Sequence, residues 1–223
     1  GLYNASGPGQ SLEAALEDEI RALDRPVTLK VLVSLSCTMC PDLVTAAQRI
    51  AAENEKITAE VCAHHLWWTA DDHATLGARI KWNPAIKTDK DRQALRDGLN
   101  NGLIDIVATD HAPHLLSEKQ GGAIKATSGA PLVQYSLPMM LQLADEGVFT
   151  IEQVVDFMAH RVAQLFSIEK RGYIREGYYA DLTIVKPNEQ YTVKDEDVLS
   201  RCGWTPLAGT TLNNKVISTY VNG

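Results

Sequence analysis

The 223-residue chain has a formal net charge of −7 and an apolar content of 45%, a composition typical of a globular protein. The negative charge argues against nucleic acid or an anionic membrane as a general partner, and the longest apolar stretches are far shorter than the roughly 20 residues that cross a bilayer. Residues 1–10 have neither the basic region nor the apolar core of a signal peptide, and four cysteines are too few for a disulfide scaffold, so we expect a cytoplasmic protein.

The first predicted elements include a strand–helix–strand unit. Ser11 caps a predicted helix that Pro26 ends. Residues 27–35 are rich in Val, Leu and Thr and predict a buried strand. A helix from Pro41 to about residue 53 and a second strand at 57–62 follow. We expect the two strands to be parallel and their connection right-handed.

The alternation of helices and strands continues to about residue 170. Apolar spacing predicts helices at 89–102, 131–146 and 150–166, and a buried strand at 104–108. Thr150 and Gln153 have the spacing of a capping box. From residue 172 the pattern changes to short strands, expected at 173–174, 180–185, 191–193 and 216–222. The sequence therefore predicts an α/β protein with a small β-rich segment at its end.

Two clusters of polar residues directly follow predicted strands: residues 63–66 (AHHL) and residues 108–114 (ATDHAPH). In a parallel α/β barrel the carboxyl ends of the strands meet at one end, where active sites are assembled. Imidazole and carboxylate groups suit Zn²⁺, which activates bound water while a nearby carboxylate moves protons. The alternative for His64 and His65 is that they are surface or hydrogen-bonded residues. For His111 and His114 the alternative is a solvated loop.

Four strings resemble dihydroorotase motifs, in the order and spacing of that family: 57–68 (ITAEVCAHHLWW), 81–87 (KWNPAIK), 107–114 (VATDHAPH) and 172–185 (GYIREGYYADLTIV). The resemblance implies a member of the amidohydrolase superfamily, whose barrels hold one or two Zn²⁺ ions. Dihydroorotases interconvert dihydroorotate and carbamoyl-aspartate in pyrimidine biosynthesis. The fold implied is a partial (β/α) barrel over residues 57–170, followed by a β-domain segment over 171–223.

The same resemblance assigns roles to individual residues. His65 matches a metal ligand of the family. Asp110 matches the aspartate that binds metal and relays a proton to the leaving amide nitrogen, so it is the candidate catalytic residue. Asn83 and His114 match residues that contact the dihydroorotate ring and its carboxylate. His64 occupies a position that relatives fill with other residues, so we leave it out of the site.

The chain also departs from the family pattern. It has no His-x-His pair, and its first histidine is His64, so the other metal ligands of the family are not matched. Two ligands are too few for a catalytic zinc, which takes about three plus water. We therefore expect the chain to be inactive alone towards its small-molecule substrate, and its open sheet edges to permit self-association. For His111 and Asp181 we expect structural roles.

Residues 1–56 resemble another family. The string 23–54 (LDRPVTLKVLVSLSCTMCPDLVTAAQRIAAEN) is similar to the thioredoxin-like N-terminal domain of the alkyl hydroperoxide reductase flavoprotein subunit. The resemblance implies a redox dithiol, with Cys37 attacking and Cys40 resolving. A dithiol redox module, a non-catalytic chimera and a pair of inert thiols thus remain alternatives. The strand from residue 57 would fit either family, so the chain is a candidate splice of two coding sequences.

Overall fold

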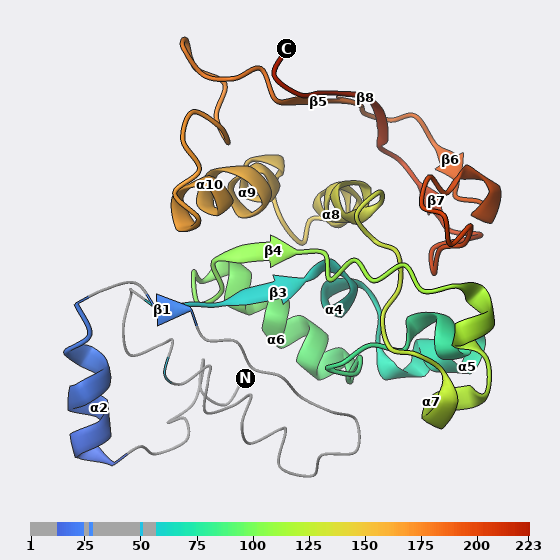
Figure 1. The fold of residues 1–223 in the computed structure, drawn as a ribbon, viewed down its shortest axis with the longest axis horizontal. Coiled ribbons are helices and arrows are strands. Elements are labelled where there is room, and N and C mark those ends of the chain that lie inside the picture. The colour runs from blue at the N-terminus through green and yellow to red at the C-terminus, as the bar shows by residue number, and fades with distance from the viewer. Residues whose placement is uncertain (1–12, 25–26, 29–49, 51–56) are drawn as a thin grey trace. The chain divides into compact units, whose positions relative to one another are not determined.

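The computed structural model describes residues 13–24, 27–28, 50 and 57–223 (Figure 1). The chain divides into two compact units: Gly1–Asp71 with Asn83–Asp105, and Asp72–Trp82 with Ile106–Gly223. In the part of the chain that the structure describes, no helix has the length and apolar character needed to cross a membrane. Helices and strands are mixed along the chain, as the α/β prediction requires.

The first unit contains short strands and three described α-helices. They are α2 (Ala14–Arg21), β1 (Val27–Thr28), β2 (Ile57–Thr58), β3 (Glu60–Cys62), α4 (Ala63–Trp67) and α6 (Asp89–Asn100); a 3₁₀ turn, η1 (Ala70–Asp72), begins at its edge. Strands β1 and β2 are parallel, with Val27 opposite Ile57, which confirms the predicted direction of this pair. The predicted cap Ser11, most of the strand at 27–35 and nearly all of the helix from Pro41 lie outside the described residues.

Helix α2 buries part of its apolar stripe. Its N-cap is Glu13 rather than the predicted Ser11, and Ile20 is its buried residue, while 42% of Leu16 is exposed. The prediction of a helix before Pro26 is confirmed over the described residues. An amphipathic helix this short depends on packing rather than propensity for its stability.

Helix α6 fixes the short helix α4 that carries His65. Thr88 and Asp91 cap α6 reciprocally, the Asp91 amide donating to Thr88 Oγ1 at 3.4 Å and the Thr88 amide to Asp91 Oδ2 at 3.0 Å. Arg96 donates to the carbonyl of Leu66 at 2.8 Å, and Arg92 donates to the carbonyl of Trp67 at 2.7 Å. These arginines satisfy carbonyls at the end of α4, which have no partner within so short a helix.

The second unit contains five α-helices, a π-helical turn and five strands among the described residues. The helical elements are α5 (His73–Leu76), η2 (Gly77–Ile80), η3 (Leu116–Lys119), α7 (Gly122–Lys125), α8 (Ser136–Asp145), α9 (Ile151–Val155), the π-helical η4 (Asp156–His160), α10 (Arg161–Leu165) and η5 (Asp195–Asp197). The strands are β4 (Ile106–Ala108), β5 (Leu182–Lys186), β6 (Tyr191–Thr192), β7 (Thr211–Leu212) and β8 (Lys215–Tyr220).

Most predicted elements after residue 88 are found, with shifted ends. Elements α9, η4 and α10 follow one another without a break, and Thr150 and Gln153 form the predicted capping box. Helix α8 begins at Ser136 rather than at residue 131. A start at 131 would place Pro138 in the helix interior, where proline lacks an N–H and its ring clashes with a carbonyl. With the observed start, Pro138 lies in the first turn, which tolerates it.

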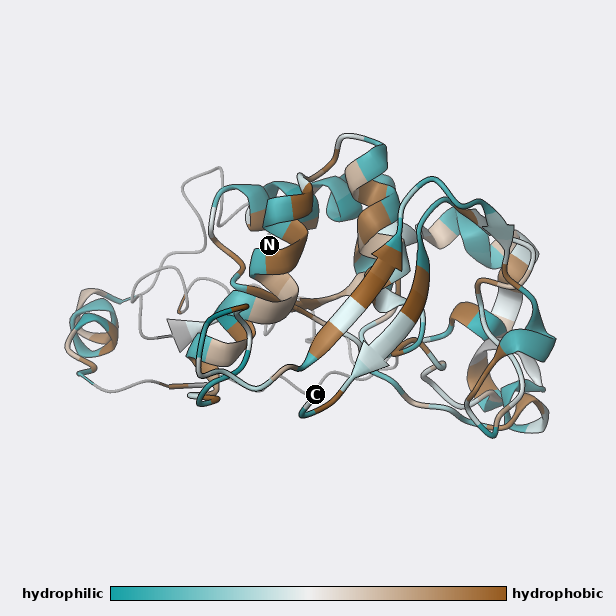
Figure 2. Cartoon of the chain, turned by 90° about the horizontal axis from the view of Figure 1, so that it is seen from above, coloured by the Kyte–Doolittle hydropathy of each residue, from teal (hydrophilic) through white to brown (hydrophobic). Residues whose placement is uncertain are grey.

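The end of the chain forms two antiparallel strand pairs, β5 with β8 and β6 with β7. A register irregularity interrupts β5 between Ile184 and Val185, and Figure 2 shows apolar residues along both strands of this pair. The predicted strand at 173–174 is wrong, because these residues lie in an irregular segment. Strand β7 was not predicted from the sequence.

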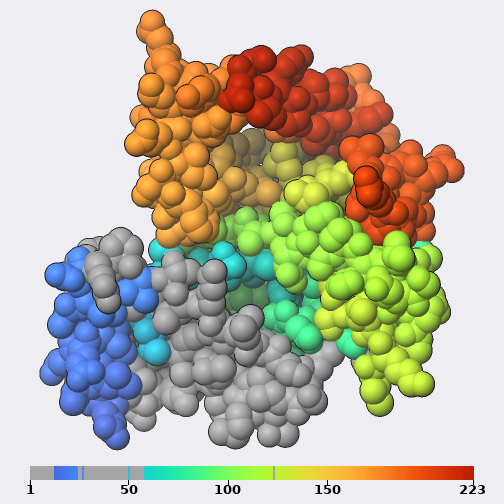
Figure 3. Space-filling view, viewed as in Figure 1, coloured from blue at the N-terminus to red at the C-terminus, as the bar shows by residue number. Residues whose placement is uncertain are grey.

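A core of large apolar side chains holds the second unit together. Trp204, Leu132, Met139 and Leu207 are fully buried, and Phe157 is 1% exposed. Residues 115–118, by contrast, are exposed and belong to the lime-green region of the surface in Figure 3. The segment after β4 thus runs between a packed interior and solvent.

Candidate functional site

His65 lies in α4, directly after strand β3. Its Nε2 is 3.0 Å from the carbonyl oxygen of Pro84, and because a carbonyl only accepts, Nε2 carries the proton in the neutral ring. Nδ1 is then the nitrogen with the lone pair. Metal-binding histidines commonly donate their other ring N–H to a carbonyl or carboxylate in this way.

The environment of His65 favours the neutral imidazole. Burial, more than any other effect, lowers its pKa, with a smaller lowering from Lys87, while the hydrogen bond to Pro84 acts in the opposite direction. The neighbouring His64 is fully buried, and its pKa lies well below the ordinary value because of burial and, secondarily, of His65. A neutral ring is the form that binds a metal.

Asn83 is linked to His65 through the proline that follows it in the sequence. It precedes Pro84, whose carbonyl binds His65, through a cis peptide bond, and its side chain is exposed. The first unit therefore brings His65 and the Asn83–Pro84 peptide together. These are two of the four residues that the resemblance places at a dihydroorotase site.

Asp110 follows strand β4 in the second unit and is exposed. Its φ of +45° lies in the left-handed region, which aspartate adopts more readily than most residues. The chain turns at this residue, so the buried strand ends and a polar loop begins. The sequence predicted this placement of a carboxylate after an apolar strand.

His111 has a structural role in the same loop. Its Nδ1 accepts hydrogen bonds from the backbone amides of Leu132 (3.0 Å) and Val133 (3.2 Å). The amide of Ala112 donates to the carbonyl of Ala130 at 3.1 Å. These contacts join the loop after β4 to residues 130–133, so His111 is a hydrogen-bonded residue rather than part of a solvated loop.

His114 has a partly exposed side chain and a firmly bound backbone. Its Nδ1 is 3.9 Å from Glu118 Oε2, and 36% of the side chain is exposed. Its carbonyl accepts a hydrogen bond of 2.8 Å from the indole N–H of Trp204. The imidazole is therefore accessible to a ligand while the peptide group is fixed.

The second unit also contains a buried lysine that sequence reasoning missed. Lys119 is 4% exposed, and burial, with a smaller contribution from Lys81, lowers its pKa to about 8. In the sequence it stands in the polar string SEKQGG, which is typical of a solvated turn. No local signal reveals its burial, because its partners come from elsewhere in the chain.

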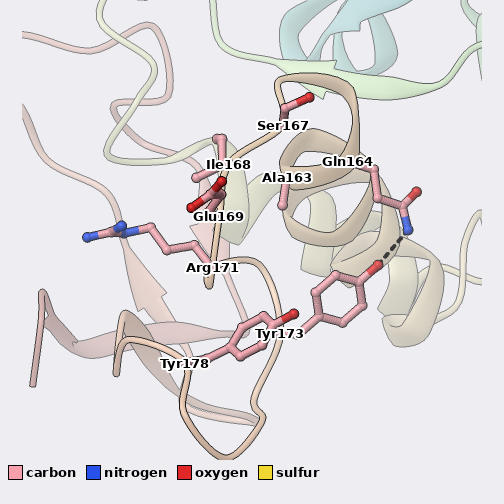
Figure 4. Close-up of a pocket in the computed structure, with 8 residues that line it drawn as sticks. All are labelled: Ala163, Gln164, Ser167, Ile168, Glu169, Arg171, Tyr173 and Tyr178. Atoms are coloured by element: carbon pink, nitrogen blue, oxygen red, sulfur yellow. Dashed lines mark hydrogen bonds between the residues drawn. The ribbon is translucent and has the colours of Figure 1, made fainter.

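An open pocket of about 330 Å³ lies beside α10 and the irregular segment that follows it (Figure 4). Tyr173 and Tyr178 line it, and Gln164 donates to the Tyr173 hydroxyl at 2.6 Å. Its one arginine, Arg171, is bound to Asp181 at 2.5 Å. Of the predicted site residues that the structure describes, none lines this pocket.

A complete zinc site is not formed by the residues that the structure describes. Within them, no group of three or more His, Cys, Asp or Glu side chains is placed to hold a metal ion. His65 and Asn83 belong to one compact unit, and Asp110 and His114 to the other. Cys37 and Cys40 lie outside the described residues, so the structure does not test the redox hypothesis.

Curated relatives of this chain include dihydroorotases. It is 36% identical over 197 residues to the dihydroorotase of Halobacterium salinarum, which covers 86% of this chain and 46% of that protein. It is 38% identical over 168 residues to the dihydroorotase of Staphylococcus aureus, covering 75% of this chain and 39% of that protein. The chain thus spans less than half the length of these relatives.

Solved structures of hydantoinases have a similar fold. The L-hydantoinase (dihydropyrimidinase) of Arthrobacter aurescens matches with a TM-score of 0.76 and 27% identity, over 88% of this chain and 43% of that chain. The dihydropyrimidinase of Brevibacillus agri matches with a TM-score of 0.72 and 22% identity, over 94% of this chain and 45% of that chain. The second likeness concerns the fold alone.

The family match extends into the segment predicted to be thioredoxin-like. The model of the amidohydrolase family matches residues 28–223, which include most of the segment predicted to be thioredoxin-like. The comparisons give no support to the alkyl hydroperoxide reductase resemblance. By the extent of this match and the identity to dihydroorotases, the chain belongs to the amidohydrolase family, whose members are generally metal-dependent.

Proposed function

We propose that the chain belongs to a dihydroorotase-type cyclic amidohydrolase, which reversibly hydrolyses dihydroorotate to carbamoyl-aspartate. The observation that carries this proposal is the 36–38% identity to dihydroorotases over three quarters or more of the chain. The hydantoinase likeness is compatible with it, because both classes open a cyclic amide. Its lower identity of 27% favours dihydroorotate over a hydantoin as substrate.

The residues have separate roles in this proposal. Asp110 accepts a proton from the attacking water and returns it to the ring nitrogen as the carbon–nitrogen bond breaks, which is the work of a general acid–base group. His65 would hold a metal through its Nδ1 lone pair, since Nε2 donates to the carbonyl of Pro84. Asn83 and His114 contact the substrate ring and carboxylate.

The described residues do not complete a zinc site. We propose that the ligands beyond His65 and Asp110 come from another polypeptide segment, because zinc sites in enzymes take about three protein ligands plus water. Dihydroorotate turnover by the 223-residue chain alone should be undetectable. Within the chain, we propose a barrel segment at 57–170 and a β-domain segment at 171–223.

A chimaera tests the proposal. The 197-residue stretch of similarity in the Halobacterium salinarum enzyme is replaced by the matching stretch of this chain, and carbamoyl-aspartate formation is measured. The chimaera should be active, and Asp110→Asn should lower its turnover by roughly 10²- to 10⁴-fold, because the amide cannot accept the proton. Asp181→Asn is the matched control, because this carboxylate binds Arg171 and the Asn222 amide, and it should retain activity.

Two results would overturn the proposal. One is a folded chimaera in which Asp110→Asn leaves turnover unchanged. The other is a folded chimaera that opens hydantoins and leaves dihydroorotate untouched, which would assign the chain to the hydantoinase type. Circular dichroism of each variant establishes that it is folded.

A further inference from the structure

The backbone of the loop after β4 is held by a tryptophan that comes 90 residues later in the chain. Trp204 is fully buried, and its indole N–H donates to the carbonyl of His114 at 2.8 Å. A buried indole usually has such a partner. Here the partner is the peptide group of a residue whose imidazole is partly exposed, so the bond fixes the base of that side chain.

Trp204 is itself fixed by charged groups. The Arg79 guanidinium lies 5.5 Å from the centre of the ring, a distance at which a cation is attracted to the ring face. Arg79 is bound in turn to Asp195 at 2.8 Å and to the carbonyl of Thr205 at 3.0 Å. Thr205, which follows Trp204, is thus bound to the arginine that lies beside the Trp204 ring. The ring has little freedom to move away from His114.

Lys119 binds backbone carbonyls of segments beside this loop. Its Nζ donates to the carbonyls of Gly129 (2.7 Å), Thr127 (2.8 Å) and Lys81 (3.3 Å). With its pKa lowered only to about 8, the amine remains mostly protonated at pH 7 and keeps three N–H donors for three carbonyls. The same Nζ lies 5.7 Å from the centre of the Trp204 ring.

Gly129 connects this lysine to the candidate site. Its φ is +110°, and a Cβ there would lie 2.5 Å from Ala112 Cβ and 3.4 Å from His114 Cδ2. Only glycine permits so close an approach in this conformation. The peptide group that Lys119 holds is therefore packed directly against residues 112–114.

We propose that Trp204 and Lys119 are positioning residues that hold His114 in place to receive the carboxylate of the substrate. Trp204 acts through the backbone of His114, and Lys119 acts through Gly129. The inference rests on the proposed function for the identity of the ligand, and on the contacts above for the positioning itself. It adds a role for the C-terminal β-rich segment, which supplies Trp204 to the loop after β4.

Hydrogen exchange of the 223-residue chain, followed by mass spectrometry, tests the positioning without any turnover. Trp204→Phe keeps a ring but removes the N–H donor to His114. Exchange in residues 110–115 should accelerate roughly two- to tenfold, as expected for the loss of one hydrogen bond. Trp68→Phe is the matched control, because Trp68 is a buried tryptophan of the other unit, and it should leave that exchange unchanged.

Lys119→Met provides an independent variant that keeps the length of the side chain. It leaves the carbonyls of Gly129 and Thr127 without their donor, so exchange should accelerate in residues 127–130 and in 110–115. Lys125→Met, at an exposed lysine, is the control. Unchanged exchange at 110–115 in the folded variants, or equal acceleration throughout the second unit, would overturn the proposal. Lys119→Met tests the proposed positioning even if Trp204→Phe does not fold.

The chimaera separates this inference from the proposed function. In it, Trp204→Phe should raise the KM for dihydroorotate more than it lowers kcat, because His114 binds substrate and does not move the proton. Equal loss in both constants would contradict a positioning role. If dihydroorotate were not a substrate, the exchange results would still show whether Trp204 and Lys119 hold the loop after β4. Only the identification of the ligand would then be wrong.

Discussion

One backbone contact determines which ring nitrogen of His65 carries the proton. Because Pro84 offers a carbonyl to Nε2, the neutral ring carries its proton there, and Nδ1 has the lone pair. Burial lowers the pKa of the ring and so favours this neutral form near pH 7. The residue that family resemblance assigns to the metal is thus in the state that a metal requires.

His111 shows what sequence could and could not reveal at the scale of a residue. Its string, ATDHAPH, places it beside Asp110, and the family resemblance predicts a structural role for it, but the pattern contains nothing of its partners. Those partners are the amides of Leu132 and Val133, about 20 residues away. Local sequence does not encode such contacts. The burial of Lys119 could not be predicted for the same reason.

Replacing His111 should destabilise the chain. His111→Ala leaves the amides of Leu132 and Val133 without their acceptor, which should lower the free energy of unfolding by about 1–3 kcal/mol. His111→Asn offers an oxygen near the position of Nδ1 and should lose less. Urea unfolding of both variants measures the difference. Equal stability of His111→Ala and the unchanged chain would contradict the structural role.

The redox hypothesis makes its own prediction at Cys37. A thiol at a helix N-terminus has a lowered pKa and reacts faster as the thiolate. On this hypothesis Cys37 lies at the start of a helix, so it should be alkylated before Cys40, Cys62 and Cys202 near neutral pH, as ranked by mass spectrometry after a brief exposure. Equal labelling of the four thiols would remove the redox alternative.

Helix α8 and the segment before β5 show the limits of periodicity at the scale of elements. Apolar spacing placed the start of α8 five residues too early, because Leu132 and Tyr135 are apolar, buried and three residues apart, as on a helix face. The covalent geometry of Pro138 sets the boundary instead. The strand expected at 173–174 fails because no partner strand pairs with these residues in the described part of the chain.

Asp181, directly before β5, binds the segment that follows β8. It accepts hydrogen bonds from Asn222 N at 2.7 Å and from Arg171 Nε at 2.5 Å. The Asn222 amide and then the Arg171 side chain lower the pKa of this carboxyl. A carboxyl with a depressed pKa in the folded state stabilises the fold above its unfolded pKa, and the effect is lost as pH falls through the folded pKa.

Asp181→Asn therefore has a pH-dependent effect on stability. At pH 6 the unchanged chain should have the higher urea midpoint, and the difference should shrink as pH falls below about 4, near the ordinary aspartate pKa. Urea titrations between pH 3 and pH 6 measure it. A difference that stays constant over this range would show that the charge of Asp181 does not contribute.

For the molecule as a whole, sequence reasoning gave the α/β character and most elements after residue 88. It found the family because four strings kept their order and spacing. It did not find the contacts of the loop after β4, which link residues 79, 119, 129 and 204. Self-association through open sheet edges and a cytoplasmic location stay predictions.

We propose that the chain contributes two of the family's metal ligands, His65 and Asp110, and zinc content tests this conclusion most directly. The purified 223-residue chain is dialysed against metal-free buffer, and zinc per chain is measured by mass spectrometry. Well below one equivalent should remain, because His65 and Asp110 are two ligands where a catalytic site takes about three plus water. One or more tightly held zinc ions per chain would contradict the conclusion and require ligands beyond these two residues.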